Sequence, residues 1–125
     1  MMILYHVTET KNLENIKNQG LIAQIGQRSL KIKEYKKAVY FFKDIEAVEN
    51  ALENWLGDQF DEDAELALLA VNIPNEIHIF DGAAFEHYTI KDIEAKNIRV
   101  LSTNILDQNN DFFNNLKCEI QSISI

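Results

Sequence analysis

The sequence has few of the features that would tie it to an oxidising compartment or to a membrane. It contains one cysteine, Cys118, among 125 residues, so no disulfide can form within the chain. No apolar run approaches the roughly 20 residues that a membrane-spanning helix requires. The first residues lack the basic stretch and long apolar segment of a secretory signal. These absences predict a cytoplasmic protein that is not inserted in a membrane.

Positive charge is also scarce. Twelve Lys and Arg residues stand against twenty Asp and Glu residues, which gives a formal net charge of −8. Phosphate backbones repel such a surface, so general nucleic-acid binding is disfavoured. One segment differs, because residues 27–37 carry five basic residues and one acidic residue. This basic segment is compatible with a small anionic ligand, and also with a solvated lysine-rich loop.

Glycine and proline are rare, and the few that occur mark the ends of predicted elements. Apolar and β-branched runs predict strands at 2–7, 38–42, 66–73, 76–80, 85–90 and 97–101. Apolar residues at three- and four-residue spacing predict a short helix over 11–19, stopped by Gly20, and a second helix that begins after Asp44. Residues 21–37 show no period, and a loop of that length is usually functional or mobile.

This order of elements predicts one α+β domain over residues 1–125. Two strand–helix pairs followed mostly by strands are typical of a curved, mainly antiparallel sheet with two to three short helices. The content of 46% apolar and 26% charged residues is ordinary for a globular domain. Residues 103–125 form a C-terminal extension rich in Asn, for which the sequence predicts a docked helix and a final edge strand over 119–125.

Common catalytic and cofactor-binding motifs are missing. The sequence has no Gly-rich phosphate loop, no pair of histidines four residues apart, and no Cys-x-x-Cys. Its three histidines, His6, His78 and His87, lie on different predicted strands, so no metal site is expected. Cys118 lies in the polar extension without a partner nearby in the sequence, and no nucleophilic role is predicted for it.

Two motifs in the first half of the chain carry chemically useful residues on predicted strands. Residues 4–8, Leu-Tyr-His-Val-Thr, place His6 on the first strand, ahead of the helix that stops at Gly20. Residues 39–42, Val-Tyr-Phe-Phe, place Tyr40 on an aromatic strand that leads into the second helix.

A third motif follows in the second half of the chain. Glu86 lies on a predicted strand, Ile93 follows seven residues later, and residues 98–101 form a closing strand. In this order the three motifs resemble the ADP-ribosyltransferases of the poly(ADP-ribose) polymerase and diphtheria-toxin type. The resemblance covers residues 3–101 and implies an ADP-ribosyltransferase-like fold.

The resemblance implies an enzyme that uses NAD as its substrate and transfers ADP-ribose to a macromolecular acceptor or to water. His6 would hydrogen-bond the nicotinamide ribose, the Val7 backbone would hold the carboxamide, and Thr8 would fill part of the same motif. Tyr40 would stack on the nicotinamide ring. Glu86 would accept a hydrogen bond from the ribose 2′-hydroxyl and stabilise the positive charge of an oxocarbenium-like transition state.

Position and charge, rather than the resemblance, suggest the residues that bind the pyrophosphate. Arg28 and Ser29 lie in the long loop between the first two motifs. A guanidinium group matches the geometry of phosphate oxygens, so Arg28 is the candidate ligand.

Each motif residue also has a plainer interpretation. His6 and Tyr40 are equally consistent with core packing, and Glu86 would face solvent if the Phe85 side of its strand were the core. Two other functions therefore stay open. One is a non-catalytic acidic binding or inhibitor module for a basic protein partner. The other is an RNA 2′-phosphotransferase-like activity on the same fold.

Overall fold

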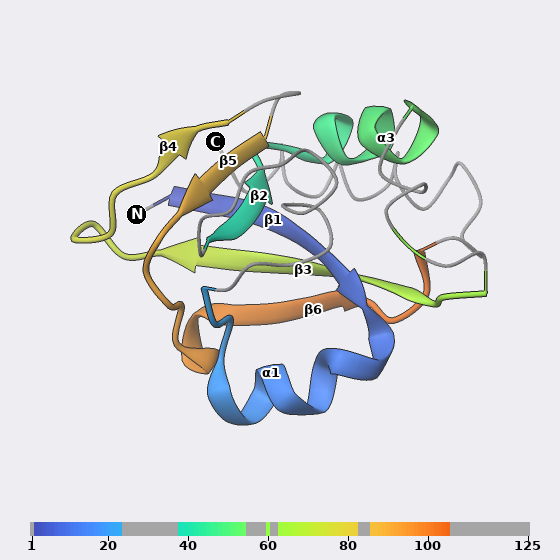
Figure 1. Ribbon diagram of the computed structural model, residues 1–125, viewed down its shortest axis with the longest axis horizontal. Coiled ribbons are helices and arrows are strands. Elements are labelled where there is room, and N and C mark those ends of the chain that lie inside the picture. The colour runs from blue at the N-terminus through green and yellow to red at the C-terminus, as the bar shows by residue number, and fades with distance from the viewer. Residues whose placement is uncertain (1, 24–37, 55–59, 61–62, 83–85, 106–125) are drawn as a thin grey trace, which may run out of the picture.

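The computed structural model describes residues 2–23, 38–54, 60, 63–82 and 86–105. They form an open six-stranded sheet and two short α-helices (Figure 1). The elements are β1 (Met2–Glu9), α1 (Leu13–Gln19), β2 (Val39–Phe42), α3 (Ile45–Asn54), β3 (Leu66–Ile73), β4 (Phe80–Asp81), β5 (Glu86–Thr89) and β6 (Ile98–Ser102). All pairings between these strands are antiparallel. The predicted α+β class and antiparallel sheet are confirmed.

The first strand lies in the middle of the sheet, whose order is β4-β5-β2-β1-β3-β6. On one side β1 pairs with β3 over eight residues, from Met2↔Ile73 to Glu9↔Leu66. On the other side it pairs with β2 at one position, Tyr5↔Phe42. The sheet therefore consists of a β1-β3-β6 part and a β2-β5-β4 part, which are joined by a short ladder.

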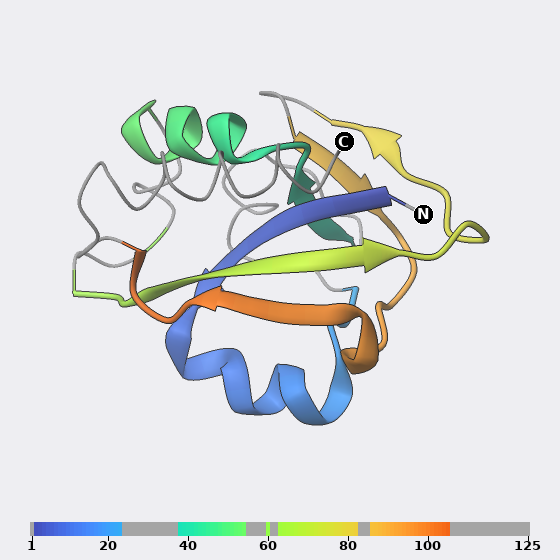
Figure 2. The ribbon, with the colours of Figure 1, turned by 180° about the vertical axis from the view of Figure 1, so that it is seen from behind.

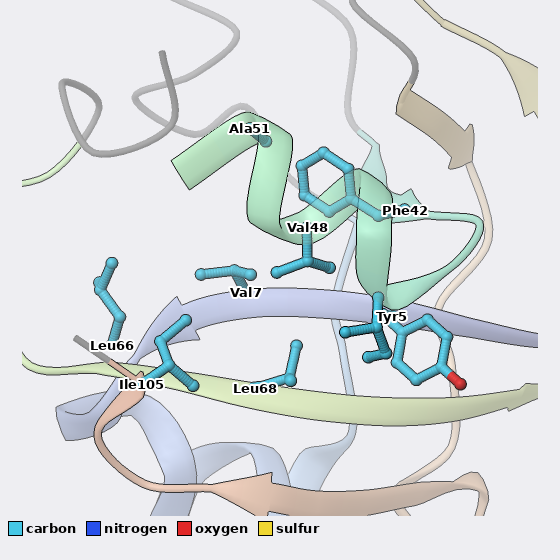
Figure 3. Close-up of a cluster of buried hydrophobic side chains, with 9 residues drawn as sticks. Tyr5, Val7, Phe42, Val48, Ala51, Leu66, Leu68 and Ile105 are labelled. Atoms are coloured by element: carbon cyan, nitrogen blue, oxygen red, sulfur yellow. The ribbon is translucent and has the colours of Figure 1, made fainter. Parts of the chain in front are cut away.

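Both faces of the sheet carry core side chains, because side chains alternate along each strand. Odd residues of β1 and even residues of β3 face α3 (Figure 3). This cluster consists of Tyr5, Val7, Phe42, Ile45, Val48, Ala51, Leu66, Leu68 and Ile105. Burial on both faces explains the near-continuous apolar run of β3.

The opposite face holds a second cluster, to which α1 contributes through the partly buried Leu13 and Ile16. Its buried members are Leu4, Leu21, Val39, Phe41, Leu69, Val71, Ile73 and Ile93. Figure 2 shows the sheet from behind, with α1 and α3 at opposite ends of the view. We call the two sides of the sheet the α3 face and the α1 face.

The predicted helix boundaries at Gly20 and Asp44 are present. Gly20 ends α1 with a φ of 78°, and a Cβ at this position would lie 2.0 Å from the carbonyl oxygen of Ile93. Only glycine fits this backbone without displacement. Asp44 precedes α3, and its Oδ1 accepts a hydrogen bond from the Ala47 amide at 2.8 Å, as an N-cap does.

The predicted strand over 76–80 is wrong. Residues 74–77 form a turn, in which the Ile77 amide donates to the Pro74 carbonyl at 3.0 Å, and the strand begins only at Phe80. Asp81, one residue beyond the predicted strand, belongs to this strand. The proline explains the difference, because its fixed φ favours a turn directly after β3.

Several predictions lie outside the described residues. They are most of the loop over 21–37 and the helix and edge strand of the C-terminal extension. Within the described ranges, no helix is both long enough and apolar enough to cross a membrane.

Candidate functional site

The three strands that carry the predicted catalytic residues are neighbours. His6 lies on β1, Tyr40 on β2 and Glu86 on β5, and these strands are consecutive in the order β5-β2-β1. Two strand spacings, or about 10 Å, separate β1 from β5. Residues 80 positions apart in the sequence thus belong to one region of the sheet.

His6 forms a side-chain bond between the two parts of the sheet. Its Nδ1 donates to the backbone carbonyl of Tyr40 at 2.6 Å, next to the single backbone pair that joins β1 to β2. The half-buried imidazole also makes an edge-on contact with Phe41 at a centroid distance of 6.0 Å. The side chain therefore supports β2 where the backbone ladder is short.

Burial keeps the His6 ring neutral. Desolvation lowers the pKa of His6 below its ordinary value of 6.5, while the hydrogen bond to Tyr40 opposes this effect and raises it. A carbonyl oxygen can only accept, so the proton of the neutral ring lies on Nδ1. Nε2 then carries a lone pair and can accept a hydrogen bond.

Tyr40 and Glu86 share one face of the sheet, and His6 lies on the other. Tyr40 pairs with Tyr88 and Phe42 pairs with Glu86, which places all four side chains on the α3 face. His6 packs against Phe41 on the α1 face. The fold therefore brings together two of the three predicted catalytic side chains on one surface.

Glu86 begins β5 and is only 4% exposed. The alternative in which this side chain faces solvent is therefore excluded. Its carbonyl oxygen accepts the Gly82 amide at 2.8 Å, which ties the residue after β4 to the start of β5. Glutamates are seldom this deeply buried, which makes the position a candidate for function.

Three aromatic rings lie across β2, β5 and β4 near Glu86, and a fourth, that of His78, lies just before β4; we call these four rings the aromatic row. The centroids of Tyr40 and Tyr88 lie 6.0 Å apart, and the Tyr88 ring stacks on Phe80 at 5.1 Å with an interplanar angle of 18°. His78 meets Phe80 edge-on at 4.4 Å. Sequence reasoning missed this row, although the spacing of Glu86 to Tyr88 places this pair on one face of β5.

Two of the remaining predicted binding residues, Val7 and Thr8, lie on β1. The Val7 side chain is buried on the α3 face, while the Thr8 hydroxyl accepts a hydrogen bond from the Asn12 side chain at 3.4 Å. Arg28 and Ser29 lie outside the described residues. The chain that leads to them is fixed, because the Ala23 amide donates to Asp92 Oδ1 at 2.8 Å.

The sequence analysis did not single out Arg99, a cationic residue that lies on the α3 face. Arg99 pairs across β6 and β3 with Ala70, which in turn pairs with Tyr5 of β1. Burial raises the pKa of the Tyr5 phenol, Arg99 lowers it, and Asp44 raises it further. Tyr5 and Arg99 therefore lie on either side of Ala70 on the same face of the sheet.

His87 points away from Glu86, as strand alternation predicts. Its Nδ1 lies 3.1 Å from Asp81 Oδ1, so this pair links β5 to β4 on the α1 face. Among the described residues, no group of three or more His, Cys, Asp or Glu side chains is arranged to hold a metal ion.

The candidate site thus consists of the buried Glu86 carboxylate beside partly exposed aromatic rings on the β2-β5-β4 part of the sheet. The neutral His6 imidazole lies on the opposite face. Neither a model of a known protein family nor a curated protein matches the chain.

Proposed function

We propose that the chain binds NAD on the α3 face of β2 and β5 and transfers ADP-ribose to a macromolecular acceptor, with water as a competing acceptor. One observation carries this proposal: the buried Glu86 and the partly exposed Tyr40 lie on neighbouring strands and on the same face. As diagonal cross-strand neighbours their Cβ atoms are about 7–8 Å apart. A nicotinamide ring and its attached ribose span a similar length.

The proposed reaction uses the two side chains differently. The bond between ribose C1′ and the nicotinamide nitrogen breaks, and its electron pair leaves with nicotinamide. Glu86 accepts a hydrogen bond from the ribose 2′-hydroxyl and stabilises the positive charge that develops at C1′. Tyr40 stacks on the leaving ring. The acceptor nucleophile then bonds to C1′ and releases its proton to solvent.

His6 acts as a positioning residue in this proposal. Its Nδ1 bond to the Tyr40 carbonyl fixes β2 against β1, and thereby fixes the ring of Tyr40 relative to Glu86. This role differs from a direct contact with the ribose, because the imidazole lies on the α1 face. Replacing His6 should therefore weaken NAD binding through the placement of Tyr40.

The proposal is tested by nicotinamide release and by NAD-dependent thermal stability. NAD should raise the melting temperature in a saturable manner, by an amount set by its concentration relative to Kd. Glu86→Gln should reduce nicotinamide release about 10²- to 10³-fold while the fold is retained. Glu65→Gln is the matched control, because Glu65 is an exposed carboxylate directly before β3.

Two results would refute the proposal. One is wild-type protein that millimolar NAD neither stabilises nor occupies. The other is nicotinamide release that is as fast in Glu86→Gln as in Glu65→Gln.

The separation of His6 from Tyr40 and Glu86 favours a second candidate, a non-catalytic acidic binding module on the same fold. A net charge of −8 suits a basic protein partner. This candidate predicts no NAD-dependent stabilisation, but salt-sensitive binding of a basic protein. The thermal-shift experiment therefore separates the two functions.

A further inference from the structure

The Tyr5 side chain ends in a hydroxyl group that has no partner in the described part of the chain. Tyr5 is only 5% exposed and belongs to the cluster on the α3 face. Figure 3 shows its ring directed away from α3, with the hydroxyl at the outer end. Among the described residues, no group forms a hydrogen bond with this hydroxyl. Polar groups on side chains buried this deeply usually have a partner, so the Tyr5 hydroxyl is available to a ligand.

Arg99 is exposed on the same face and also lacks a partner. It pairs with Ala70, which pairs on its other side with Tyr5. Burial raises the pKa of the Tyr5 phenol and Arg99 lowers it, so the guanidinium group acts on the phenol across Ala70. Although the sequence has twenty acidic residues, no carboxylate in the described ranges forms an ion pair with Arg99.

Asn72 brings a third donor to the same region. It follows Ala70 by two residues on β3, so the two side chains lie on one face about 7 Å apart. The Asn72 side chain is exposed, and none of the residues that the structure describes forms a hydrogen bond with its amide group. Donors from the neighbouring strands β1, β3 and β6 therefore surround the small side chain of Ala70.

We propose that Tyr5, Asn72 and Arg99 form a binding site for a phosphate group of a ligand. The guanidinium group offers parallel N–H donors that match phosphate oxygens, and the hydroxyl and amide groups add donors from the next strands. A phosphate group presents three terminal oxygens to this set, whereas a carboxylate presents two. Asp44 also acts on Tyr5, but its Oδ1 already accepts the Ala47 amide.

The phosphate site does not require NAD cleavage, because none of its three side chains takes part in the proposed reaction. Glu86 lies on β5, two strand spacings or about 10 Å from Tyr5 on β1. The phosphate group can therefore belong to the diphosphate of NAD or to another phosphorylated ligand.

The test measures the binding of inorganic pyrophosphate and of acetate to the full chain by calorimetry. Pyrophosphate should bind, and rising salt should weaken its binding. Acetate should bind at least about 10-fold more weakly, because it offers fewer oxygens and less charge. Changes in the backbone amide chemical shifts of Ala70 and Arg99 locate the anion.

Three variants and one control complete the design. Arg99→Gln should weaken pyrophosphate binding about 10-fold or more, because a charged hydrogen bond is lost. Tyr5→Phe removes only the hydroxyl and should weaken binding about 2- to 10-fold, as should Asn72→Ala. Lys17→Gln removes the same charge from an exposed position on α1, on the opposite face, and should leave Kd unchanged. Circular dichroism establishes that every variant is folded.

Competition by NAD identifies the source of the phosphate group. If NAD displaces pyrophosphate from the wild-type protein, the site holds the diphosphate of NAD. If NAD does not displace it, the site serves another phosphorylated ligand.

Three outcomes would overturn the proposal: no binding of pyrophosphate at millimolar concentration, equal binding of pyrophosphate and acetate, or equal Kd values in Arg99→Gln and Lys17→Gln. Because pyrophosphate contains no nicotinamide, a failure of NAD cleavage would not affect these results. Equally, a failure of pyrophosphate binding would leave the proposed transferase activity intact.

Discussion

The two sides of β1 differ greatly in how they are attached to the rest of the sheet. Toward β3, β1 makes an eight-residue ladder whose central side chains are buried on both faces. Toward β2, it makes one backbone pair and the hydrogen bond from His6 to Tyr40. The first junction depends on backbone pairing and apolar burial, and the second depends on a few specific side chains.

Because of this difference, most of the stabilising backbone pairing and the proposed site lie in different parts of the sheet. The β1-β3-β6 part holds a large share of the buried apolar side chains, whereas the β2-β5-β4 part holds Glu86 and the aromatic row. The two parts remain joined by apolar packing as well, because Val39, Phe41 and Phe42 of β2 belong to the two clusters. Substitutions on the two sides of β1 should differ in size and in pH dependence.

The largest effect is expected in the long ladder. Leu69 on β3 is fully buried opposite His6, and Leu69→Ala should lower the free energy of unfolding by about 2–5 kcal/mol through lost burial and a cavity. Urea unfolding followed by circular dichroism measures this loss. A loss below about 1 kcal/mol would contradict the view that this ladder dominates stability.

A smaller effect is expected at the short junction. His6→Ala leaves the buried side of the Tyr40 carbonyl without its donor, which costs about 1–3 kcal/mol. Because burial lowers the folded-state pKa of His6 below 6.5, the unfolded chain binds the proton more readily. The stability that neutral His6 contributes is complete above pH 6.5, and it is lost as the pH falls below that value through the folded-state pKa.

Measurements of the unfolding free energy above and below pH 6.5 test whether stability falls on acidification. The wild-type protein should lose stability on acidification more steeply than His6→Ala. His78→Gln alters an exposed histidine and should retain the wild-type slope. If the unfolding free energy of the wild-type protein and of His6→Ala fell equally with pH, protonation of His6 would not be the cause of the acid-induced loss of stability.

The helix that follows β2 provides a test of intermediate size. Asp44→Ala removes the acceptor of the Ala47 amide and should cost about 1 kcal/mol. Asp44→Asn keeps an oxygen acceptor and should cost less. If both variants lost the same stability, the negative charge of Asp44, and not its hydrogen bond to the Ala47 amide, would be what stabilises the start of α3.

The smallest effect is expected at the surface. Lys96 and Glu94 form an ion pair at 3.4 Å, and both side chains are about three-quarters exposed. Lys96→Ala should therefore change the melting temperature by less than the measurement error, since exposed pairs contribute little. A clear loss of stability would mean that the connection before β6 carries more energy than its exposure suggests.

The sequence predicted the helices and strands more accurately than it predicted which strands pair with one another. Gly20 and Asp44 mark their helix boundaries through local backbone chemistry, and the apolar run of β3 shows its burial directly. The two-residue strand β4 escaped prediction because so short a strand has no alternation of its own and depends on pairing with β5.

The candidate site was predictable only in part. Motif order placed His6, Tyr40 and Glu86 on separate strands, and the sheet order makes these strands neighbours. The faces on which the side chains lie depend on the β1–β2 register, which one pair sets and which no local pattern encodes. The aromatic row similarly requires the registers of β2, β5 and β4, which the sequence does not reveal.

The central position of β1 has a consequence for biosynthesis. Residues 2–9 leave the ribosome before residues 66–73, and each residue of β1 pairs with a β3 residue more than 50 positions further along the chain. The β3 side of this nascent segment, with its run of apolar side chains, therefore has no partner strand until residues 66–73 have been translated, although β2 emerges earlier. We expect folding through such long-range pairing to be slow.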